Sequence, residues 1–413
     1  MIEIERYRLA NGLTVITHVD RSTPMAAVNL LYKVGARNEN PDKTGFAHLF
    51  EHLMFGGSRN IPSYDTPLQN VGGENNAFTT NDITDYYLTL PADNLETAFW
   101  LESDRMLELA FSQESLDVQK KVVTEEFKQR YFNQPYGDIP LLARPLAYKV
   151  HPYRWPTIGS DISHIEKAEL DDVRRFFFAH YAPDNAILVV AGNVDADRVN
   201  SLADKWFGSI SRQSAPRLPI PAEPEQTERR ELHVERSVPA DYIHMQFHMG
   251  GRLDREYYVC DTLTDILAAG ASSRLTQRLI KDRRIFSDVN AFISGDDDPG
   301  LLSLTGTLMP GVGFAQAEQA LLDEALLIAD KGITAREFEK IKIRNEASMV
   351  YAEMSYANKA NNLAYFEHLS EAEAINREVE IYNSIGIDEV RQASERIFRP
   401  ANASVLYYHS LKN

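Results

Sequence analysis

The sequence is poor in cysteine. Cys260 is the only cysteine among 413 residues. A single thiol excludes an intrachain disulfide, and it also excludes the cysteine clusters that hold structural zinc. A metal site in this chain must therefore use histidine, aspartate or glutamate side chains.

The sequence also lacks any long apolar run. No stretch of 18 apolar residues is present that could span a bilayer, and the first ten residues, MIEIERYRLA, carry charges where a signal peptide has its apolar core. We therefore expect a soluble chain with no membrane partner. Cytoplasmic localisation is favoured because no signal peptide is visible, and a periplasmic location would require that a signal has been removed.

Basic residues are outnumbered by acidic ones. Lys and Arg total 43 against 60 Asp and Glu, so the formal net charge is −17 at pH 7. This charge repels phosphate groups, and we expect no nucleic acid as a partner. At 413 residues the chain exceeds the size of one hydrophobic core, so two domains are the default expectation.

What the sequence does contain is a pair of histidines at helical spacing. The stretch 46–55, FAHLFEHLMF, has no Pro or Gly, and its apolar residues predict a helix buried on most sides. His48 and His52 would lie one turn apart, so both imidazoles could reach one Zn²⁺. Glu51 lies on the same side, where it could take a proton from a water at the metal. The order His-x-x-Glu-His is the inverted zincin signature. The alternative is a pair of core histidines bonded to the backbone.

A third ligand should lie on a different element, because catalytic zinc sites commonly use three protein ligands and keep the fourth position for water. The stretch 115–131, SLDVQKKVVTEEFKQRY, predicts a helix with an apolar buried face. Glu126 projects toward that face, whereas Glu125 projects toward solvent. A carboxylate on an apolar face is costly unless it is paired or metal-bound, so Glu126 is the predicted ligand. A buried ion pair with a lysine is the alternative.

Several motifs occur in order along nearly the whole chain. They are GFAHLFEHLMFGGS at 45–58, GGENNAFT at 72–79 followed by Asp82, Thr84, Tyr86 and Tyr87, VVTEE at 122–126, and HPY at 151–153 followed by Ile158 and Gly159. In these motifs the chain resembles the pitrilysin/insulinase family of zinc metallopeptidases, in particular its short bacterial and mitochondrial-processing type. The resemblance implies one zinc per chain, held by His48, His52 and Glu126.

The resemblance also implies a fold and a reaction. The fold would be α+β, with two tandem homologous domains that each pack an antiparallel sheet against helices and together form half of a hollow peptidase shell. The reaction would be hydrolysis of short or unfolded peptides by a zinc endopeptidase or oligopeptidase, with Glu51 as the general base. The family also contains inactive members, so a non-catalytic structural or interaction subunit is the alternative function.

A comparison of the two halves supports the tandem arrangement. Residues 30–37, LLYKVGAR, match residues 245–252, MQFHMGGR, at an offset of 215 positions. Only the first copy can hold the metal, because the second copy has apolar residues at the motif positions. At this offset the motif residues His48, Glu51 and His52 correspond to Leu263, Ile266 and Leu267.

A proline-rich stretch separates the two copies. Residues 212–227, RQSAPRLPIPAEPEQT, favour an extended linker. We therefore expect an N-terminal zinc-binding catalytic domain at 1–211, a linker at 212–230, and a C-terminal homologous domain without metal at 231–413.

Local patterns predict the main elements of the first half. They predict two strands about an Asn-Gly turn in 6–18, strands at 26–34 and 186–191, helices at 95–109 and 170–180, and irregular structure at 136–156. By resemblance, Asn76 and Ala77 lie on an edge strand beside the metal, where a peptide substrate adds as a further strand. The alternative is that Asn76 is a turn residue after two glycines.

Two features expected from the resemblance are missing. The family uses an Arg and a Tyr, seven residues apart in the second half, to hold the substrate carbonyl, but the matching positions here are Ile280 and Ser287. Arg283 and Arg284 are the candidate substitutes. Gln119 stands where the family usually has a glutamate that supports the site. Because family members of this length work as two-chain shells, we expect a heterodimer with a related chain that keeps the Arg and Tyr. A homodimer is the alternative.

Overall fold

The computed structural model describes residues 1–211, 213–216 and 219–411, so residues 212, 217 and 218 of the predicted linker lie outside the described part of the chain. The chain forms two compact units, and each takes a segment from the other half of the sequence. The units are Met1–Lys128, Trp155–Ile220 and Met349–Arg377 for the first, and Gln129–Arg154, Pro221–Ser348 and Glu378–Asn413 for the second. The predicted division at 1–211, 212–230 and 231–413 stays a prediction.

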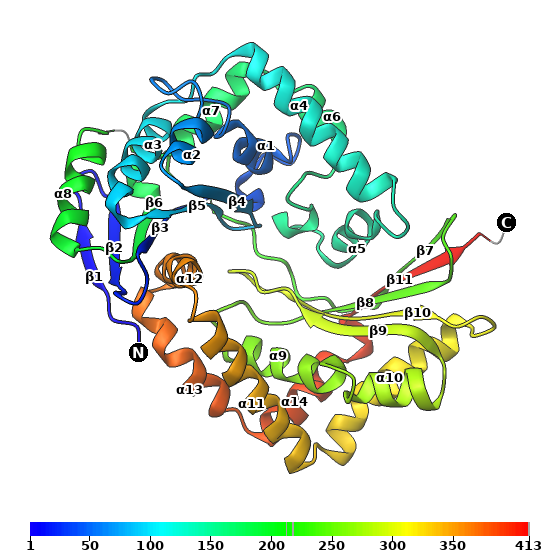
Figure 1. Cartoon of the computed structure of the whole chain (residues 1–413). Helices are drawn as coiled ribbons and strands as arrows, with labels where there is room; N and C mark the ends of the chain where they lie inside the picture. Colours follow the sequence, from blue (N-terminus) through cyan, green and yellow to red (C-terminus); the bar gives the residue numbers. More distant parts are fainter. Residues whose placement is uncertain (212, 217–218, 412–413) are drawn as a thin grey trace. The chain divides into compact units, whose positions relative to one another are not determined.

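The first unit is built on a six-stranded sheet in the order β1-β2-β6-β3-β5-β4 (Figure 1). Its strands are β1 (Glu5–Arg8), β2 (Thr14–Val19), β3 (Met25–Tyr32), β4 (Glu74–Thr79), β5 (Thr84–Pro91) and β6 (Ala186–Gly192). Strands β2 and β6 are parallel, and the other neighbours are antiparallel. The predicted turn joins β1 to β2, and Gly12 there has a φ of 97°, which glycine adopts without strain.

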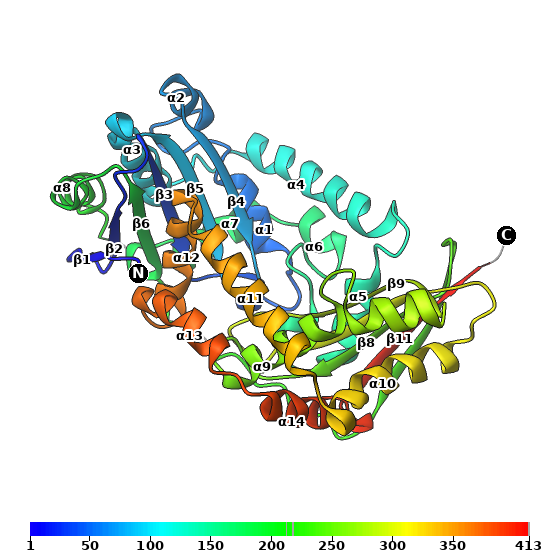
Figure 2. The ribbon, with the colours of Figure 1, turned by 60° about the horizontal axis from the view of Figure 1, so that its bottom comes forward.

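Helices lie on both faces of this sheet. They are α1 (Phe46–Leu53), α2 (Asp65–Asn70), α3 (Leu95–Leu107), α4 (Gln113–Phe127), α6 (Ile162–Glu166), α7 (Leu170–His180), α8 (Ala196–Phe207) and α12 (Tyr356–Leu369). Figures 1 and 2 show α12 on one side of the sheet, and α1 and α3 on the other. Helix α12 buries Ala360, Leu363 and Ala364 in one core with apolar residues of β2, β3 and β6. The second half of the sequence thus completes the core of the first unit.

The second unit contains a five-stranded sheet in the order β7-β11-β8-β10-β9. Its strands are β7 (Arg230–Arg236), β8 (Tyr242–His248), β9 (Phe286–Ile293), β10 (Leu301–Leu308) and β11 (Ala403–Ser410). Strands β7 and β11 are parallel and the other neighbours antiparallel, which repeats β2-β6-β3-β5-β4 of the first unit. The predicted α+β fold with two related sheets is confirmed. Both sheets are mixed, however, because the last strand of each copy pairs in parallel with an early strand.

Most helices of the second unit pack on one face of its sheet. They are α9 (Arg255–Ala268), α10 (Phe314–Lys331), α13 (Glu378–Asn383) and α14 (Ile387–Ile397), while α11 (Ala335–Ala352) begins in the second unit and ends in the first. Their apolar residues share a core with Ile243, Met245 and Phe247 of β8. Among the described residues, every helix is too short or too polar to cross a membrane.

The prediction of irregular structure at 136–156 is wrong in part, because α5 (Ile139–Ala147) forms there. Pro140 lies in the first turn, where a backbone N–H has no intrahelical partner, so it does not interrupt the helix. Ile139 and Ala143 are buried against the face of the second sheet opposite the main core, with Leu406 and Tyr408. Tertiary packing therefore outweighs the local signal of the prolines.

Candidate metal centre

The start of α1 is fixed by a buried carboxyl group. Glu39, 7% exposed, accepts hydrogen bonds from the Gly45 N–H at 2.8 Å and the Ala47 N–H at 2.7 Å. These N–H groups have no partner within the helix itself. Burial raises the pKa of Glu39 to about 8. Gly45 has a φ of 88°, and a Cβ there would meet the Ile158 carbonyl oxygen at 2.5 Å, so glycine is required at this position.

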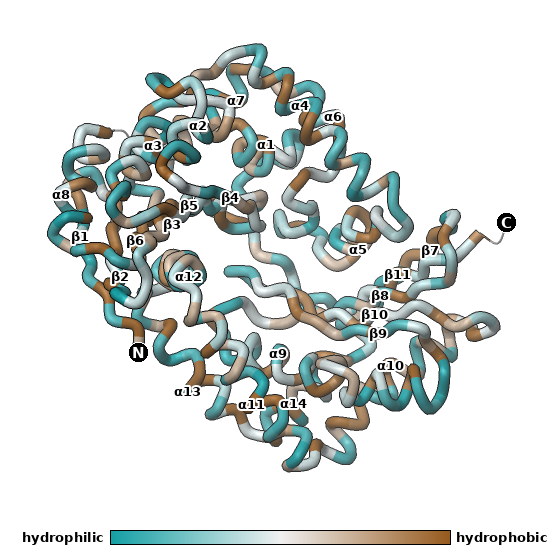
Figure 3. Tube along the Cα trace, in the orientation of Figure 1, coloured by the Kyte–Doolittle hydropathy of each residue, from teal (hydrophilic) through white to brown (hydrophobic). Residues whose placement is uncertain are grey.

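Helix α4 presents Glu126 from its last turn. Its buried face carries Leu116, Val123 and Phe127, as predicted. Hydrophilic residues predominate along the rest of α4 in Figure 3. Glu125 points into solvent, where it pairs with Lys128 at 2.7 Å, whereas the Glu126 side chain is only 22% exposed. Gln119, two turns earlier, is half-buried. The helical face therefore separates the two neighbouring glutamates as expected.

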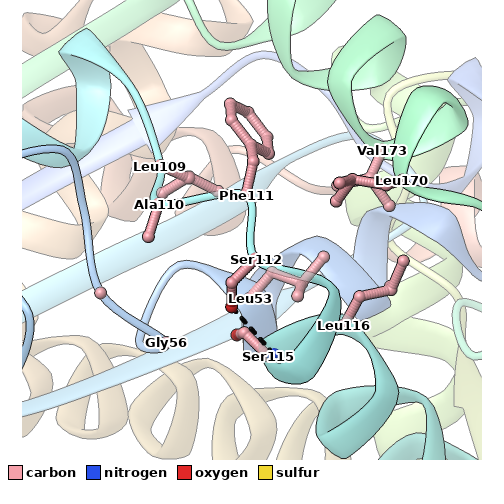
Figure 4. A pocket seen from close by; sticks show the side chains of 11 residues that line it. Leu53, Gly56, Leu109, Ala110, Phe111, Ser112, Ser115, Leu116, Leu170 and Val173 are labelled. Carbon is pink, nitrogen blue, oxygen red and sulfur yellow. Dashed lines mark hydrogen bonds between the residues drawn. The ribbon is translucent and has the colours of Figure 1, made fainter.

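The end of α1 packs tightly against the start of α4. Figure 4 shows apolar side chains around a small gap between them, from Leu53, Leu116, Leu170 and Val173. The gap is about 10 Å³, too little for more than one water. The Ser112 hydroxyl caps α4 by accepting from the Ser115 N–H at 3.0 Å. Gly56 approaches so closely that a Cβ would meet Ser115 Oγ at 2.4 Å. This close packing fixes α1 and α4 relative to each other.

The structure brings the three predicted ligands together. Nε2 of His48 lies 3.1 Å from Oε2 of Glu126, and Nε2 of His52 lies 3.4 Å from the same oxygen. One donor atom from each residue lies within 4.8 Å of the other two. The imidazole rings are 4.9 Å apart at 82°. Two nitrogens and one carboxylate oxygen, all on packed helices, are a donor set of catalytic zinc sites, so the residues fit this ion.

Glu51 lies beside the three donors and is oriented from β4. Its Oε2 accepts a hydrogen bond from Thr79 Oγ1 at 2.6 Å and lies 3.4 Å from Nδ1 of His48. Burial favours the protonated carboxyl, but the bonds to His48 and Thr79 outweigh burial and lower the pKa of Glu51. The side chain is therefore ionised near neutral pH and able to accept a proton.

His48 is held protonated by its carboxylate neighbours. Burial disfavours the imidazolium, but hydrogen bonds to Glu126 and Glu51 outweigh burial and raise the pKa of His48 to about 9. A metal ion competes with this proton, because only a deprotonated nitrogen can be a ligand. The same carboxylates that attract a proton would attract a divalent cation.

Asn76 and Ala77 lie on the edge strand of the first sheet. Within the described residues β4 pairs with β5 alone, and α1 contacts β4. The Ala77 N–H donates to Oδ1 of Asn76 at 2.8 Å. Because Thr79 at the end of the same strand reaches Glu51, the open edge of β4 leads to the candidate centre.

The positions indicated for the Arg and Tyr carry no such side chains. Ile280 packs against the core of the second unit, and Ser287 is exposed on β9, where its hydroxyl donates to the Thr307 carbonyl at 3.3 Å. Arg283 and Arg284 are both exposed, and Arg284 has a left-handed φ of 50°. All four of these residues belong to the second unit, whereas the candidate ligands belong to the first.

Sequence reasoning gave no role to Glu39 or Thr79. Glu39 has no local signal, because its hydrogen bonds to the start of α1 depend on the path of the intervening loop. The role of Thr79 could have been predicted. Alternate residues of a strand share a face, and Thr79 lies two positions after Ala77. A hydroxyl on that face could reach a carboxylate next to the edge strand.

Models of one peptidase family match two parts of the chain. A model described as Insulinase (Peptidase family M16) matches residues 14–135, and one described as Peptidase M16 inactive domain matches residues 167–345. The first match contains all of the candidate centre. The second contains the region in which the motif histidines are replaced by leucines.

Whole-chain comparisons agree with these matches. The zinc protease PqqE of Helicobacter pylori is 30% identical over 353 residues, which cover 84% of this chain and 79% of that protein. The crystal structure of a protease from Helicobacter pylori has a TM-score of 0.93 at 25% identity and covers 99% of this chain and 100% of that one. Pitrilysin, at 18% identity, shares the fold with a TM-score of 0.76, and the match covers 45% of its chain. The chain therefore belongs to the M16 (insulinase/pitrilysin) family of zinc proteases.

Proposed function

We propose that the chain is a zinc endopeptidase or oligopeptidase that hydrolyses short or unfolded peptides, with His48, His52 and Glu126 as the ligands of one zinc ion. The observation that carries the proposal is the convergence of three donor atoms within 4.8 Å on two packed helices. Membership of a zinc protease family supports the same reading of these donors.

The chain's own residues supply the base. When bound, zinc acts as a Lewis acid that polarises a water molecule and the peptide carbonyl. Glu51 takes a proton from the water as its oxygen attacks the carbonyl carbon. As the C–N bond breaks, Glu51 returns that proton to the amine nitrogen. Thr79 orients the carboxylate throughout through its hydrogen bond to Oε2.

We expect the peptide to bind along the open edge of β4. An added strand would pair with the backbone of Asn76 and Ala77, which demands an extended substrate but no particular side chains. Because the Ala77 N–H donates to the Asn76 side chain, that side chain must rotate away before a substrate carbonyl can accept from Ala77. A stably folded protein offers no such free strand, so it should resist cleavage.

Zinc content and peptidase activity together test the proposal. Elemental analysis should find one zinc per chain, and chelation should abolish cleavage of an unfolded peptide. Glu126→Gln should weaken zinc binding by tenfold or more, while Glu125→Gln, the solvent-exposed neighbour, should leave zinc binding unchanged. Equal zinc affinity in the two variants would contradict the assignment of Glu126.

We also propose that the active enzyme is a complex of this chain with a second, related chain. The centre lacks the Arg and Tyr donors at Ile280 and Ser287, and removing even one such donor typically costs about 10²–10³ in rate. A chain without the His-x-x-Glu-His motif but with the Arg and Tyr would complete the site in a heterodimer. A homodimer of low activity is the alternative.

A further inference from the structure

Two histidines lie side by side on neighbouring strands of the second sheet. Strand β7 comes first in the order of this sheet and runs parallel to β11 (Figure 1). In this pairing His233 lies opposite Tyr407, and Glu235 lies opposite His409. Alternate residues of a strand share a face, so these four side chains lie on one face of the sheet. Nδ1 of His233 is 3.0 Å from Nε2 of His409. Neither histidine belongs to the candidate metal centre.

Aromatic contacts hold both imidazoles in place. The His233 ring stacks on the Tyr407 ring, with centroids 4.3 Å apart and planes at 18°. The His409 ring packs against Phe314 of α10, with centroids 4.6 Å apart. Tyr407 is itself fixed, because its hydroxyl donates a hydrogen bond to Glu318. Donor groups that packing already holds lose little conformational entropy when they bind a ligand, so the pair is pre-organised.

The two facing nitrogens can both present lone pairs to a cation. The rings are 5.3 Å apart, and in the hydrogen bond between them one ring carries the shared proton. A neutral imidazole can hold its single proton on either nitrogen. If the donor ring moves that proton to its other nitrogen, both facing nitrogens are free to bind metal and no net proton is released. His233 is exposed and His409 is only half-buried, so each ring can make the small turn that directs its nitrogen at one ion.

The separation of the two nitrogens indicates which ion fits. At the usual metal–imidazole distance of about 2.0–2.1 Å, a separation of 3.0 Å corresponds to an angle of about 90–100° at the ion. Neighbouring ligands in the tetragonal geometry of Cu²⁺ are about 90° apart. Zn²⁺ prefers a tetrahedron, whose angles of about 109° need a wider separation. Cu²⁺ also binds nitrogen and oxygen ligands more tightly than the other first-row divalent ions. The pair therefore fits Cu²⁺ better than Zn²⁺.

A carboxylate beside the pair can supply a third ligand. Glu231, His233 and Glu235 are exposed and alternate along β7, so they share one face of the strand. Glu235 lies opposite His409 and two positions after His233, next to both rings. Glu231 lies opposite Val405, on the far side of His233 from His409. Both glutamates add negative charge that attracts a cation, but only Glu235 adjoins both histidines.

We propose that His233 and His409 bind one Cu²⁺ ion through Nδ1 and Nε2, with Glu235 as the third ligand and water at the remaining positions. The two imidazole nitrogens at 3.0 Å carry this assignment. The site is independent of the proposed function, since it lies in the second unit and shares no residue with the candidate metal centre.

Copper binding to the full chain tests the proposal. The chain is first loaded with zinc, and Cu²⁺ is then added up to one equivalent in the presence of glycine as a competing ligand. Electron paramagnetic resonance should show tetragonal copper coupled to two imidazole nitrogens, while elemental analysis finds the zinc retained. The same signal should appear in His48→Gln, which lacks a ligand of the candidate metal centre. Release of one zinc per copper, loss of the signal in His48→Gln, or no copper binding against glycine would each overturn the proposal.

Histidine variants locate the copper. His233→Gln and His409→Gln should each weaken copper binding by roughly tenfold or more and leave coupling to at most one of the two nitrogens. His180→Gln is the matched control, because His180 is also half-buried and packs on a phenylalanine ring, that of Phe176 at 4.7 Å, but lies in the first unit. Its copper affinity should equal that of the parent. Unchanged affinity in either variant of the pair would overturn the proposal.

Glutamate variants test the third ligand. Glu235→Gln should weaken copper binding roughly tenfold, as expected when a ligand is lost. Glu231→Gln removes the same charge from the same face of β7 and should weaken binding by at most about fivefold, the limit for an exposed charge. Equal losses in the two variants would show that both glutamates act through charge alone, which would overturn the assignment of Glu235 as a ligand.

Discussion

Glu51 is the residue that we propose as the proton acceptor of the centre. We expect Glu51→Gln to retain zinc and lose hydrolysis, because the amide keeps the shape and the bond from Thr79 but cannot take a proton. The rate should fall by about 10²–10⁴. Zinc by elemental analysis and kcat/KM on one preparation would measure both. Loss of the metal together with the activity would instead make Glu51 a ligand or a structural residue.

Asp85 provides a pH-dependent prediction away from the metal ligands. It is 1% exposed, its Oδ2 accepts from Asn29 at 2.8 Å, and Oδ1 has no partner among the described residues. Burial raises its pKa from 3.8 to about 7. The folded chain therefore holds this proton to a higher pH than the unfolded chain does. The proton's contribution to the free energy of unfolding is complete below about pH 4 and is lost as pH rises from about 4 to 7.

Asp85→Asn should consequently stabilise the chain more at about pH 8 than at about pH 5. The gain at pH 8 has an upper limit of roughly 4 kcal/mol, at about 1.4 kcal/mol per pKa unit. The difference in thermal unfolding midpoint between variant and parent, measured at both pH values, checks this. A midpoint difference that is the same at both pH values would show that Asp85 stays ionised in the folded chain.

At the scale of elements, the sequence pattern was sufficient where one helix or strand carries its own signal. Helix α7 begins and ends at Leu170 and His180, as predicted, and the face of α4 separates Glu126 from Glu125. The sequence pattern was insufficient where contacts with distant parts of the chain determine whether an element forms. Helix α5 forms despite Pro140 and Pro145 because a sheet far along the sequence covers its apolar side. No local pattern could have indicated that α12 completes the core of the first unit.

The edge strand β4 gives a prediction about substrate binding. Ala77→Pro removes the N–H proposed to pair with the peptide, so kcat/KM for an unfolded peptide should fall by tenfold or more. Ala77→Ser keeps the N–H and should fall less than threefold. Zinc content should be unchanged in both, because neither variant alters a ligand. Equal losses in the two variants would indicate that the backbone of β4 does not bind substrate.

At the scale of the whole chain, the first copy of the repeat carries the candidate metal donors, whereas the second carries apolar residues at the same positions. The second sheet repeats five strands of the first in order and direction. In α9, Leu263, Ile266 and Leu267 stand where α1 has its motif residues, and all three are buried in the core of the second unit. Apolar side chains at those positions contribute to stability and bind no metal. In the second copy this helix therefore contributes packing, whereas in the first copy it presents two of the candidate metal donors.

The remaining prediction concerns the partner chain. It arises because the second copy in this chain has neither the Arg nor the Tyr that the family uses to hold the substrate carbonyl. Ile280 packs against the core of the second unit and has no donor in its side chain, and the Ser287 hydroxyl donates to the Thr307 carbonyl. We expect this chain alone to cleave an unfolded peptide poorly. Mixing it with a related chain from the same organism that lacks His-x-x-Glu-His but keeps the Arg and Tyr should raise kcat/KM by about 10² or more.

The control for that experiment is the same partner with its Arg and Tyr both changed to Ala. This variant should still form the complex, as judged by size-exclusion chromatography, but should give no gain in kcat/KM. That result would show that the partner contributes catalytic groups and does not act only by stabilising the zinc-bearing chain. Full activity of the purified chain alone, unchanged by any partner, would contradict the heterodimer. The oxyanion donors would then have to come from this chain. Arg283→Ala and Arg284→Ala would be the first variants to measure, because these two exposed arginines lie in the sequence between Ile280 and Ser287.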